Sequence, residues 1–402
     1  MGANDFSPQG LRRVHRVLSG YVQRGTLPGL VAAVAKGDST HLEVIGRRDF
    51  DRGEAMTRDS IFRIASMSKP VTAVAALMLV EDCVLRLDDP VDEFLPELAD
   101  MRVLKTPASP LEETVPAARP ITLRDLLTFQ AGFGAVWDPA WPITAAMRER
   151  GVAVGPPRMS PEPTPAPDLF LRRLGGLPLV HQPGEGWLYH SGLAVTGVLI
   201  QRASGRPFAE FLHQRLFEPL GMDDTAFHVP ADRQDRFVTA YRPDPDSGGA
   251  ETMDPAEGGR WGEPPLFPDG GGDLVSTVDD YLAFARMLMG GGVYSGTRIL
   301  SRPSVELMTG DRLGAAAKRG DGLFDGMWDA TGWGFGVQVA TARTGHAAPG
   351  RYGWNGGLGT AWFNDPRERL IGILLTQRAF SSPRPPRIVE DFETCAYAAL
   401  SG

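Results

Sequence analysis

The stretch from Phe62 to Val91, FRIASMSKPVTAVAALMLVEDCVLRLDDPV, joins a short strand-like segment to a nearly continuous apolar run. Ser66 precedes Lys69 by three residues at the point where a helix is expected to begin, and Pro70 suits an early helical position. On one helix, this spacing places the hydroxyl and the amine on the same face, within hydrogen-bonding distance. The apolar run 71–80 would keep the amine dry and lower its pKa, so that Lys69 could act as the base for a Ser66 nucleophile.

A structural interpretation of the same residues is also open, in which Ser66 is a helix N-cap and Lys69 is a solvated charge in the first turn. The helix dipole disfavours a cation at that end, which favours the catalytic interpretation. At a helix N-terminus, the backbone N–H of Ser66 would also be free to stabilise an oxyanion. Ser68 is expected to start the helix and to face elsewhere.

Strand patterns lie near both ends of the chain. Apolar runs at 30–35 and 41–46 flank a Gly-Asp turn signal and predict a hairpin. Towards the other end, three more strands and a closing helix are predicted over 332–340, 359–363, 370–375 and 387–400 respectively. The short connections favour antiparallel pairing.

Between these ends, apolar residues recur at helical spacing. Helices are predicted over 70–85, 122–129, 192–203, 208–217 and 278–289. Two stretches rich in proline, glycine and polar residues, 156–167 and 241–272, are expected to be irregular loops. The simplest architecture is a sheet built from both chain ends, with a mostly helical region inserted between them.

Composition restricts the class of partner. The chain of 402 residues has 42% hydrophobic and 22% charged residues and a net charge of −8, so no strong field favours nucleic acid or an anionic membrane. Cys83 and Cys395 form no disulfide framework, and no apolar run reaches the roughly 18 residues that span a bilayer. We therefore expect a cytoplasmic protein with a small, weakly charged or neutral partner.

Several common catalytic signatures are missing from the sequence. It contains no G-x-S-x-G elbow, no glycine-lysine P-loop and no H-E-x-x-H zinc motif. These absences argue against an α/β-hydrolase, nucleotide chemistry and zinc hydrolysis. No metal and no organic cofactor are expected.

Five further blocks follow the Ser66 segment. They are ITLRDLLTFQAGF (121–133), PGEGWLYHSG (183–192), FLHQRLFEPLGMDDTAF (211–227), DGGGDLVSTVDDYLAFARML (269–288) and GWNGGLGTAWFNDP (353–366). In this order, the blocks resemble the serine β-lactamase and penicillin-binding-protein superfamily, in the branch that holds class C β-lactamases, D-peptidases and family VIII carboxylesterases. The resemblance runs from about Leu30 to the end of the chain and is strongest to the family VIII esterases.

This resemblance implies an α+β fold, the β-lactamase/DD-peptidase-like α/β sandwich, in which helices flank an antiparallel sheet. It implies a single domain over 1–402. The sheet-containing region would comprise about 1–90 plus 285–402, and the mostly helical region about 91–284.

The resemblance also implies a second motif at Tyr189-His190-Ser191. The family's tyrosine faces the nucleophile and shuttles a proton, and Ser191 stands where many members bind substrate through an asparagine. His190 is expected to point away from the site, because side chains alternate along an extended chain. Phe129, in an earlier block, is expected to alter packing rather than mechanism.

The third implied motif is Trp354-Asn355-Gly356-Gly357, which resembles the W-x-G variant of family VIII esterases. Where relatives hold a substrate carboxylate with lysine or histidine, Trp354 offers one neutral donor. Gly356 and Gly357 would let the substrate approach the backbone closely. The N–H of Gly357 would complete an oxyanion hole with the N–H of Ser66.

The expected function is that of a serine carboxylesterase, which acts on small acyl esters through an acyl-enzyme on Ser66 with Lys69 and Tyr189 as general base. The expected partner is a small-molecule ester, with no nucleic acid and no membrane, and the oligomeric state stays open. Three alternatives remain: an amide hydrolase of the β-lactamase or D-peptidase type, an acyltransferase, and a catalytically silent scaffold.

Overall fold

The computed structural model describes residues 5–51, 53–154, 165–244, 249–320 and 322–401. Within these ranges, seven strands form an antiparallel sheet in the order β11-β12-β13-β14-β15-β1-β2. Its strands are β1 Gly29–Lys36, β2 Ser39–Gly46, β11 Thr331–Trp333, β12 Gln338–Ala340, β13 Tyr352–Gly356, β14 Thr360–Asp365 and β15 Leu370–Thr376. The sheet is therefore built from both ends of the chain, and the predicted hairpin at its N-terminal edge is confirmed.

Shorter strand pairs and the helices surround this sheet. The paired strands are β3 Phe62–Arg63 with β8 Val275–Ser276, β4 Arg102–Leu104 with β5 Thr114–Pro116, β6 Ala240–Pro243 with β7 Ala250–Asp254, and β9 Val293–Tyr294 with β10 Thr297–Arg298. The helices are α1 Pro8–Gln23, α2 Ser68–Glu81, α3 Leu123–Leu127, α4 Pro142–Glu149, α5 Pro167–Gly175, α6 Ser191–Ser204, α7 Phe208–Leu212, α8 Glu218–Leu220, α9 Val278–Met289, α10 Arg302–Met308 and α11 Arg387–Ala398. The short helical turns are η1 Ala65–Met67, η2 Pro96–Leu98, η4 His213–Phe217, η5 Ala231–Arg236 and η6 Arg260–Gly262.

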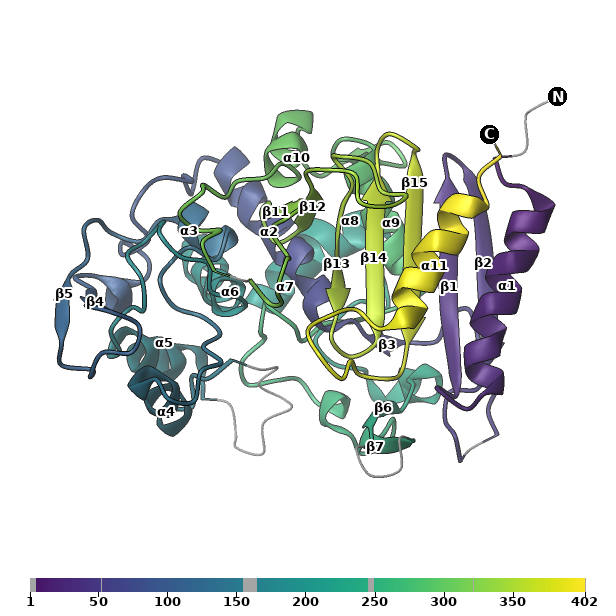
Figure 1. Ribbon diagram of the computed structural model, residues 1–402, viewed down its shortest axis with the longest axis horizontal. Helices are drawn as coiled ribbons and strands as arrows, with labels where there is room; N and C mark the ends of the chain where they lie inside the picture. The colour runs from purple at the N-terminus through teal and green to yellow at the C-terminus, as the bar shows by residue number, and fades with distance from the viewer. Residues whose placement is uncertain (1–4, 52, 155–164, 245–248, 321, 402) are drawn as a thin grey trace.

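Helices cover both faces of the sheet, which explains why β1 is apolar along its whole length. Alternate residues of a strand point to opposite faces. Val31 and Ala33 join the large core that contains α2 and α9, whereas Ala32 and Val34 join a second core with α1 and α11. Figure 1 shows α1 and α11, the first and last helices, side by side over one face. The predicted α+β fold is thereby confirmed.

The helical prediction holds for the segments with clear periodicity, which became α2, α3, α6, α7 and α9. The predicted helix 208–217 is divided, because α7 passes into the π-helical turn η4. Helix α9 spans the expected border at residue 285 and packs on β15, β1 and β14. Helices α3 to α6 gather at the left of Figure 1, beyond the β11 edge of the sheet.

Two expectations about irregular and extended segments were wrong in part. The segment 332–340 is a hairpin rather than one strand, because the chain turns between β11 and β12 with Gly336 at φ 70°. The stretch 241–272 includes the β6–β7 hairpin and the turn η6, because Tyr241 is buried and its N–H bonds the carbonyl of Gln377. The expected loop 156–167 lies mostly outside the described residues.

Helix α2 is the element that positions the candidate site. Twelve of its residues are buried, from Ser68 to Leu79, and they include polar as well as apolar side chains. Helix α6 packs against it, and the turn at Gly336 lies so close to the Lys69 carbonyl that a Cβ there would approach it to 2.8 Å. None of the helices in the described ranges combines the length and hydropathy needed to cross a bilayer.

Candidate active site

Ser66 lies in the turn η1, between β3 and α2, where the chain changes direction sharply. The preceding residue, Ala65, has φ 45°, a left-handed conformation that costs energy for a residue with a Cβ. The carbonyl of Ile64 accepts a hydrogen bond from Thr360 Oγ1 at 3.1 Å, and its N–H donates to Leu274. This support holds the strained turn, and Ser66 lines a cavity next to it.

The structure brings Lys69 to Ser66, as their spacing predicts. Lys69 Nζ lies 3.0 Å from Ser66 Oγ, and it also donates to the carbonyl of Gly271. The Lys69 side chain is fully buried, and burial lowers its pKa to about 7. At neutral pH a substantial fraction of this lysine is therefore an uncharged amine that can accept a proton.

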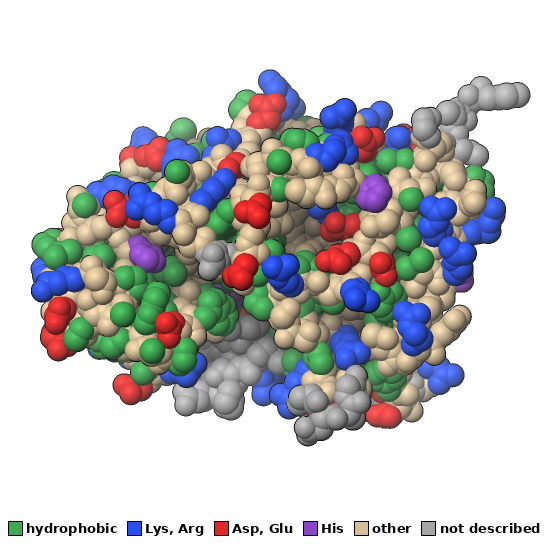
Figure 2. Space-filling view, viewed as in Figure 1, with side chains coloured by type: hydrophobic (Ala, Val, Ile, Leu, Met, Phe, Trp, Pro, Cys, Tyr) green, Lys and Arg blue, Asp and Glu red, His purple; other side chains and the backbone are tan. Residues whose placement is uncertain are grey.

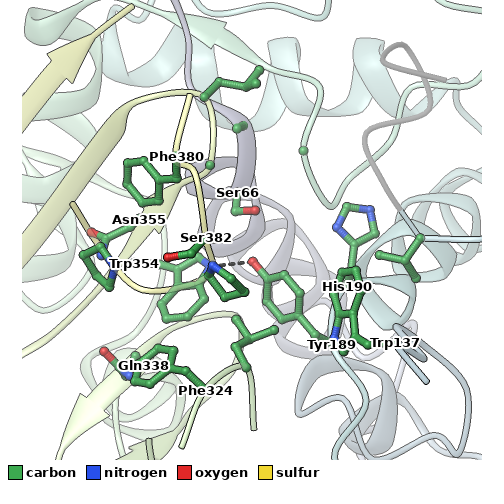
Figure 3. A pocket seen from close by; sticks show the side chains of 18 of the residues that line it. Ser66, Trp137, Tyr189, His190, Phe324, Gln338, Trp354, Asn355, Phe380 and Ser382 are labelled. Atoms are coloured by element: carbon green, nitrogen blue, oxygen red, sulfur yellow. Dashed lines mark hydrogen bonds between the residues drawn. The ribbon is translucent and has the colours of Figure 1, made fainter. Parts of the chain in front are cut away.

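The Tyr189 hydroxyl points towards Ser66 at the cavity (Figure 3). Trp354 Nε1 donates to the Tyr189 hydroxyl at 2.6 Å, and Lys69 Nζ lies 4.4 Å from the centroid of the Tyr189 ring. Burial raises the pKa of Tyr189 well above its ordinary value, so the phenol is protonated at neutral pH. Since an indole N–H can only donate, the Tyr189 proton is free to point to Ser66.

The expectation that His190 points away from the site was wrong. His190 has φ 81°, which breaks the alternation of an extended chain and turns the ring to the same region as Tyr189. Its Nδ1 lies 3.1 Å from Lys69 Nζ, and its Nε2 lies 3.0 Å from Asp269 Oδ2. Sequence reasoning missed Asp269 altogether, although the residue opens the DGGGD block.

Ser191 and Gly356 lie beneath the cavity wall. Ser191 begins α6 and is buried, so at this point the wall is formed by Tyr189 and His190. A Cβ on Gly356 would come within 2.3 Å of the Ile64 carbonyl, so this glycine lets β13 pack against the turn that carries Ser66. Both residues support the site in the structure rather than lining it.

Gly357, the next residue, does line the cavity together with Ser66. Its carbonyl accepts a hydrogen bond from the Phe380 N–H at 2.8 Å, and a Cβ at Gly357 would meet open space. The close packing at Gly356 thus places the Gly357 backbone in the same cavity wall as Ser66.

Phe129 serves packing, as expected. It is fully buried at φ 60° and contacts the rings of Trp187, Tyr189 and Trp333. Trp333 in turn packs edge-on against Trp354, with 4.7 Å between centroids. This aromatic cluster holds Tyr189 and Trp354 in place from behind.

The cavity above Ser66 has a volume of about 390 Å³ and an apolar wall. The apolar residues that line it include Trp137, Met253, Leu323, Phe324, Trp354, Leu358 and Phe380. Asn355, Gln338 and Ser382 add neutral polar groups, and no lysine, arginine, aspartate or glutamate in the described ranges lines it. Charged side chains of both signs are instead spread over the outer surface (Figure 2).

A metal site has little support from the side chains. Within the described ranges, no group of three or more histidine, cysteine, aspartate or glutamate residues is arranged to hold an ion. The residues at Ser66 are suited to proton transfer and covalent chemistry instead.

A serine that follows a strained residue and lies beside a buried lysine and a tyrosine, on a mixed sheet-and-helix fold, matches the arrangement expected of a serine hydrolase of the β-lactamase type. The chain belongs to the Beta-lactamase family, whose model matches residues 14–395. It is 39% identical to Protein Rv1367c of Mycobacterium tuberculosis over 88% of this chain and 86% of the relative. It is 30% identical to Esterase EstB of Burkholderia gladioli over 93% of this chain and 92% of the relative.

A solved structure supports the fold. EstCE1, described as a hydrolase with promiscuous acyltransferase activity, superimposes with a TM-score of 0.79 at 24% identity, over 97% of this chain and 99% of that one. The similarity extends over both the sheet and the helical region.

Proposed function

We propose that this protein is a carboxylesterase that hydrolyses neutral esters through an acyl-enzyme on Ser66. The observation that carries the proposal is the position of Ser66 Oγ, which lies between a buried lysine amine and a protonated tyrosine at the floor of an uncharged cavity. The similarity to Esterase EstB is consistent with ester chemistry.

In the proposed acylation, the neutral amine of Lys69 takes the Ser66 proton as Oγ attacks the ester carbonyl. The carbonyl oxygen becomes an oxyanion, held by the N–H groups of Ser66 and Gly357. As the bond to the alkoxy group breaks, Tyr189 donates its proton to the leaving alcohol and recovers one from the Lys69 ammonium. Water then attacks the acyl-enzyme by the same route in reverse and releases the acid.

The cavity wall favours neutral substrates. The indole N–H of Trp354 already donates to Tyr189, and no cation in the described ranges faces the cavity. A substrate carboxylate would lose water without gaining a partner, at a cost of at least a few kcal/mol, or roughly 10²-fold in kcat/KM. Penicillins, cephalosporins and D-alanyl peptides all carry such a carboxylate.

Comparing p-nitrophenyl butyrate with nitrocefin and a D-alanyl peptide tests this proposal. We expect kcat/KM for the ester to exceed the other two by about 10²-fold or more. The variant Trp354→Lys should narrow the gap, because an ammonium would pair with the carboxylate. Equal efficiency on nitrocefin and the ester would instead establish the β-lactamase alternative.

A further inference from the structure

Behind Lys69 lie two buried groups that the proposed ester mechanism does not use. His190 is 6% exposed and Asp269 is fully buried. They connect in line: Asp269 Oδ2 lies 3.0 Å from His190 Nε2, and His190 Nδ1 lies 3.1 Å from Lys69 Nζ. Burying a carboxyl group and an imidazole costs free energy unless both are hydrogen-bonded. We therefore asked what these two hydrogen-bonded groups do for Lys69.

The direction of each hydrogen bond follows from the donors and acceptors present. Asp269 Oδ1 accepts the N–H of Gly271 at 2.7 Å, which suits an ionised carboxylate. Burial alone would raise the pKa of Asp269, but the hydrogen bonds from His190 and from the Gly271 N–H outweigh it and hold that pKa below its ordinary value. An ionised carboxylate only accepts, so His190 Nε2 carries the proton.

The other ring nitrogen of His190 is then an acceptor. Burial, followed by the nearby charge of Lys69, lowers the pKa of His190, so the ring is neutral at pH 7. With its proton on Nε2, the ring directs the Nδ1 lone pair at Lys69.

This tautomer determines the direction of the Lys69 lone pair. A neutral amine has two N–H donors and one lone pair. The Gly271 carbonyl and His190 Nδ1 both accept from Lys69, and together they use both donors. The remaining position faces Ser66 Oγ at 3.0 Å, so the lone pair points at the proton that it must remove. After proton transfer, the ammonium has three donors for the same three acceptors.

We propose that Asp269 and His190 are positioning residues, which fix one histidine tautomer so that the Lys69 lone pair is aimed at Ser66. The pair also stabilises the ammonium that forms, since the Asp269 carboxylate provides its counter-charge through the ring. This inference rests on the proposed role of Ser66 as nucleophile. It adds two residues that act on Ser66 through Lys69.

The surroundings restrict the pair to this geometry. A Cβ on Gly271 would lie 3.0 Å from Asp269 Oδ1 and 3.1 Å from the His190 ring, so the glycine lets this backbone fold closely around both. The titratable groups that face Lys69 in the described ranges are Tyr189, His190 and Asp269. Of these, only Asp269 is ionised at neutral pH, and its charge opposes the effect of burial on the pKa of Lys69.

The decisive variant is Asp269→Asn. The amide N–H₂ can donate to His190 Nε2, which moves the ring proton to Nδ1 and presents a donor to Lys69. The rate of Ser66 labelling by a fluorophosphonate should fall by about 10²-fold or more, as should kcat for p-nitrophenyl butyrate, with KM changed little. The rising limb of the pH profile should move to lower pH, because the charge that raises the pKa of Lys69 is gone.

Asp280→Asn is the matched control. Asp280 is also buried and hydrogen-bonded, to Thr225 and to the N–H of Asp224, but it lies outside the cavity wall. Its replacement should leave both the rate of Ser66 labelling and the position of the rising limb of the pH profile unchanged. His190→Asn is a conservative replacement that can place an acceptor near the Nδ1 position. Its Ser66 should be labelled by the fluorophosphonate at least about tenfold faster than Ser66 of His190→Leu.

A ¹⁵N NMR spectrum of the wild-type protein tests the tautomer directly. We expect a protonated Nε2 and a bare Nδ1 for His190, and the reverse in Asp269→Asn. A protonated Nδ1 in the wild type, or unchanged labelling and pH limb in a folded Asp269→Asn, would overturn the inference. If Ser66 of the wild type reacts with the fluorophosphonate, Asp269→Asn slows that reaction, and no ester is hydrolysed, the proposed function fails while the positioning role stands.

Discussion

The two sides of Ser66 are built on opposite principles. On one side, Lys69, His190 and Asp269 are buried and form a continuous chain of hydrogen bonds that begins at Ser66. On the other, the cavity offers aromatic and aliphatic surface with a few neutral polar groups. In the proposed mechanism, activation of Ser66 depends on groups that transfer protons, whereas recognition of the substrate depends on the shape and apolar area of the cavity. Mutations on the first side should change kcat and its pH dependence, and those on the second should change KM and substrate preference.

The largest effect is expected at the point where the two sides meet. Ser66→Ala removes the proposed nucleophile, so turnover should fall by more than about 10³-fold and fluorophosphonate labelling should vanish. The cavity is untouched, so binding of a non-hydrolysable ester analogue, measured by calorimetry, should persist. Full activity in this variant would end the covalent mechanism.

Lys69→Met should be nearly as inactive, with a loss of about 10³-fold, and yet more stable. In the folded protein the pKa of Lys69 is lowered to about 7, so below that pH folding buries a charge that the unfolded chain keeps in water. The penalty is full below pH 7 and fades as the pH rises towards the ordinary lysine pKa. Urea unfolding should therefore show a higher midpoint for Lys69→Met than for the wild type at pH 6, and a smaller difference at pH 9.

The pH profile of the wild type gives the next largest effect. Because the base must be uncharged, kcat/KM should rise through an apparent pKa near 7 that belongs to the coupled groups, which corresponds to about 10²-fold between pH 5 and pH 7. A profile that peaks near pH 5 and falls above it would contradict the role of Lys69.

Trp354→Phe tests the contact that joins the two sides. The substitution keeps the aromatic packing against Trp333 but removes the N–H that donates to Tyr189. Loss of a hydrogen bond worth about 1.5 kcal/mol should lower kcat roughly tenfold, with a smaller effect on KM. A change confined to KM would mean that the indole acts only as cavity wall.

The smallest effect is expected from the wall alone. Phe380→Ala should raise KM about fivefold for the longer p-nitrophenyl esters, since about 1 kcal/mol of apolar contact is lost, and should change acetate hydrolysis less. Labelling of Ser66 should stay at the wild-type rate. Equal loss across the whole ester series would show that the ring supports the Gly357 backbone instead.

The sequence predicted what depends on local spacing and missed what depends on tertiary approach. Ser66 and Lys69 could be paired because they are three residues apart, one in the turn η1 and the other in the first turn of α2. Tyr189, Trp354 and Gly357 were found through the blocks that resemble the family. The pairing of His190 with Asp269 could not, because it joins residues 79 apart and requires a left-handed backbone at His190.

The sheet shows the same limit. Residues 332–340 read as one strand because their composition is strand-like, yet glycines within it permit a turn that packs against α2. The α1 helix was not predicted, although its apolar face covers β1 and β2 in the structure. The positions of these elements depend on contacts between residues that are far apart in the sequence.

The pairing of β1 with β15 also has a consequence for synthesis. Leu30 lies opposite Thr376, and Lys36 lies opposite Leu370, so one edge of β1 is completed by residues that are synthesised much later than β1 itself. Until these emerge from the ribosome, the β1–β2 hairpin exposes an apolar edge on which a foreign strand can pair. A stalled or truncated chain that ends before residue 370 keeps this edge permanently, and we expect such chains to be found with chaperones or in aggregates.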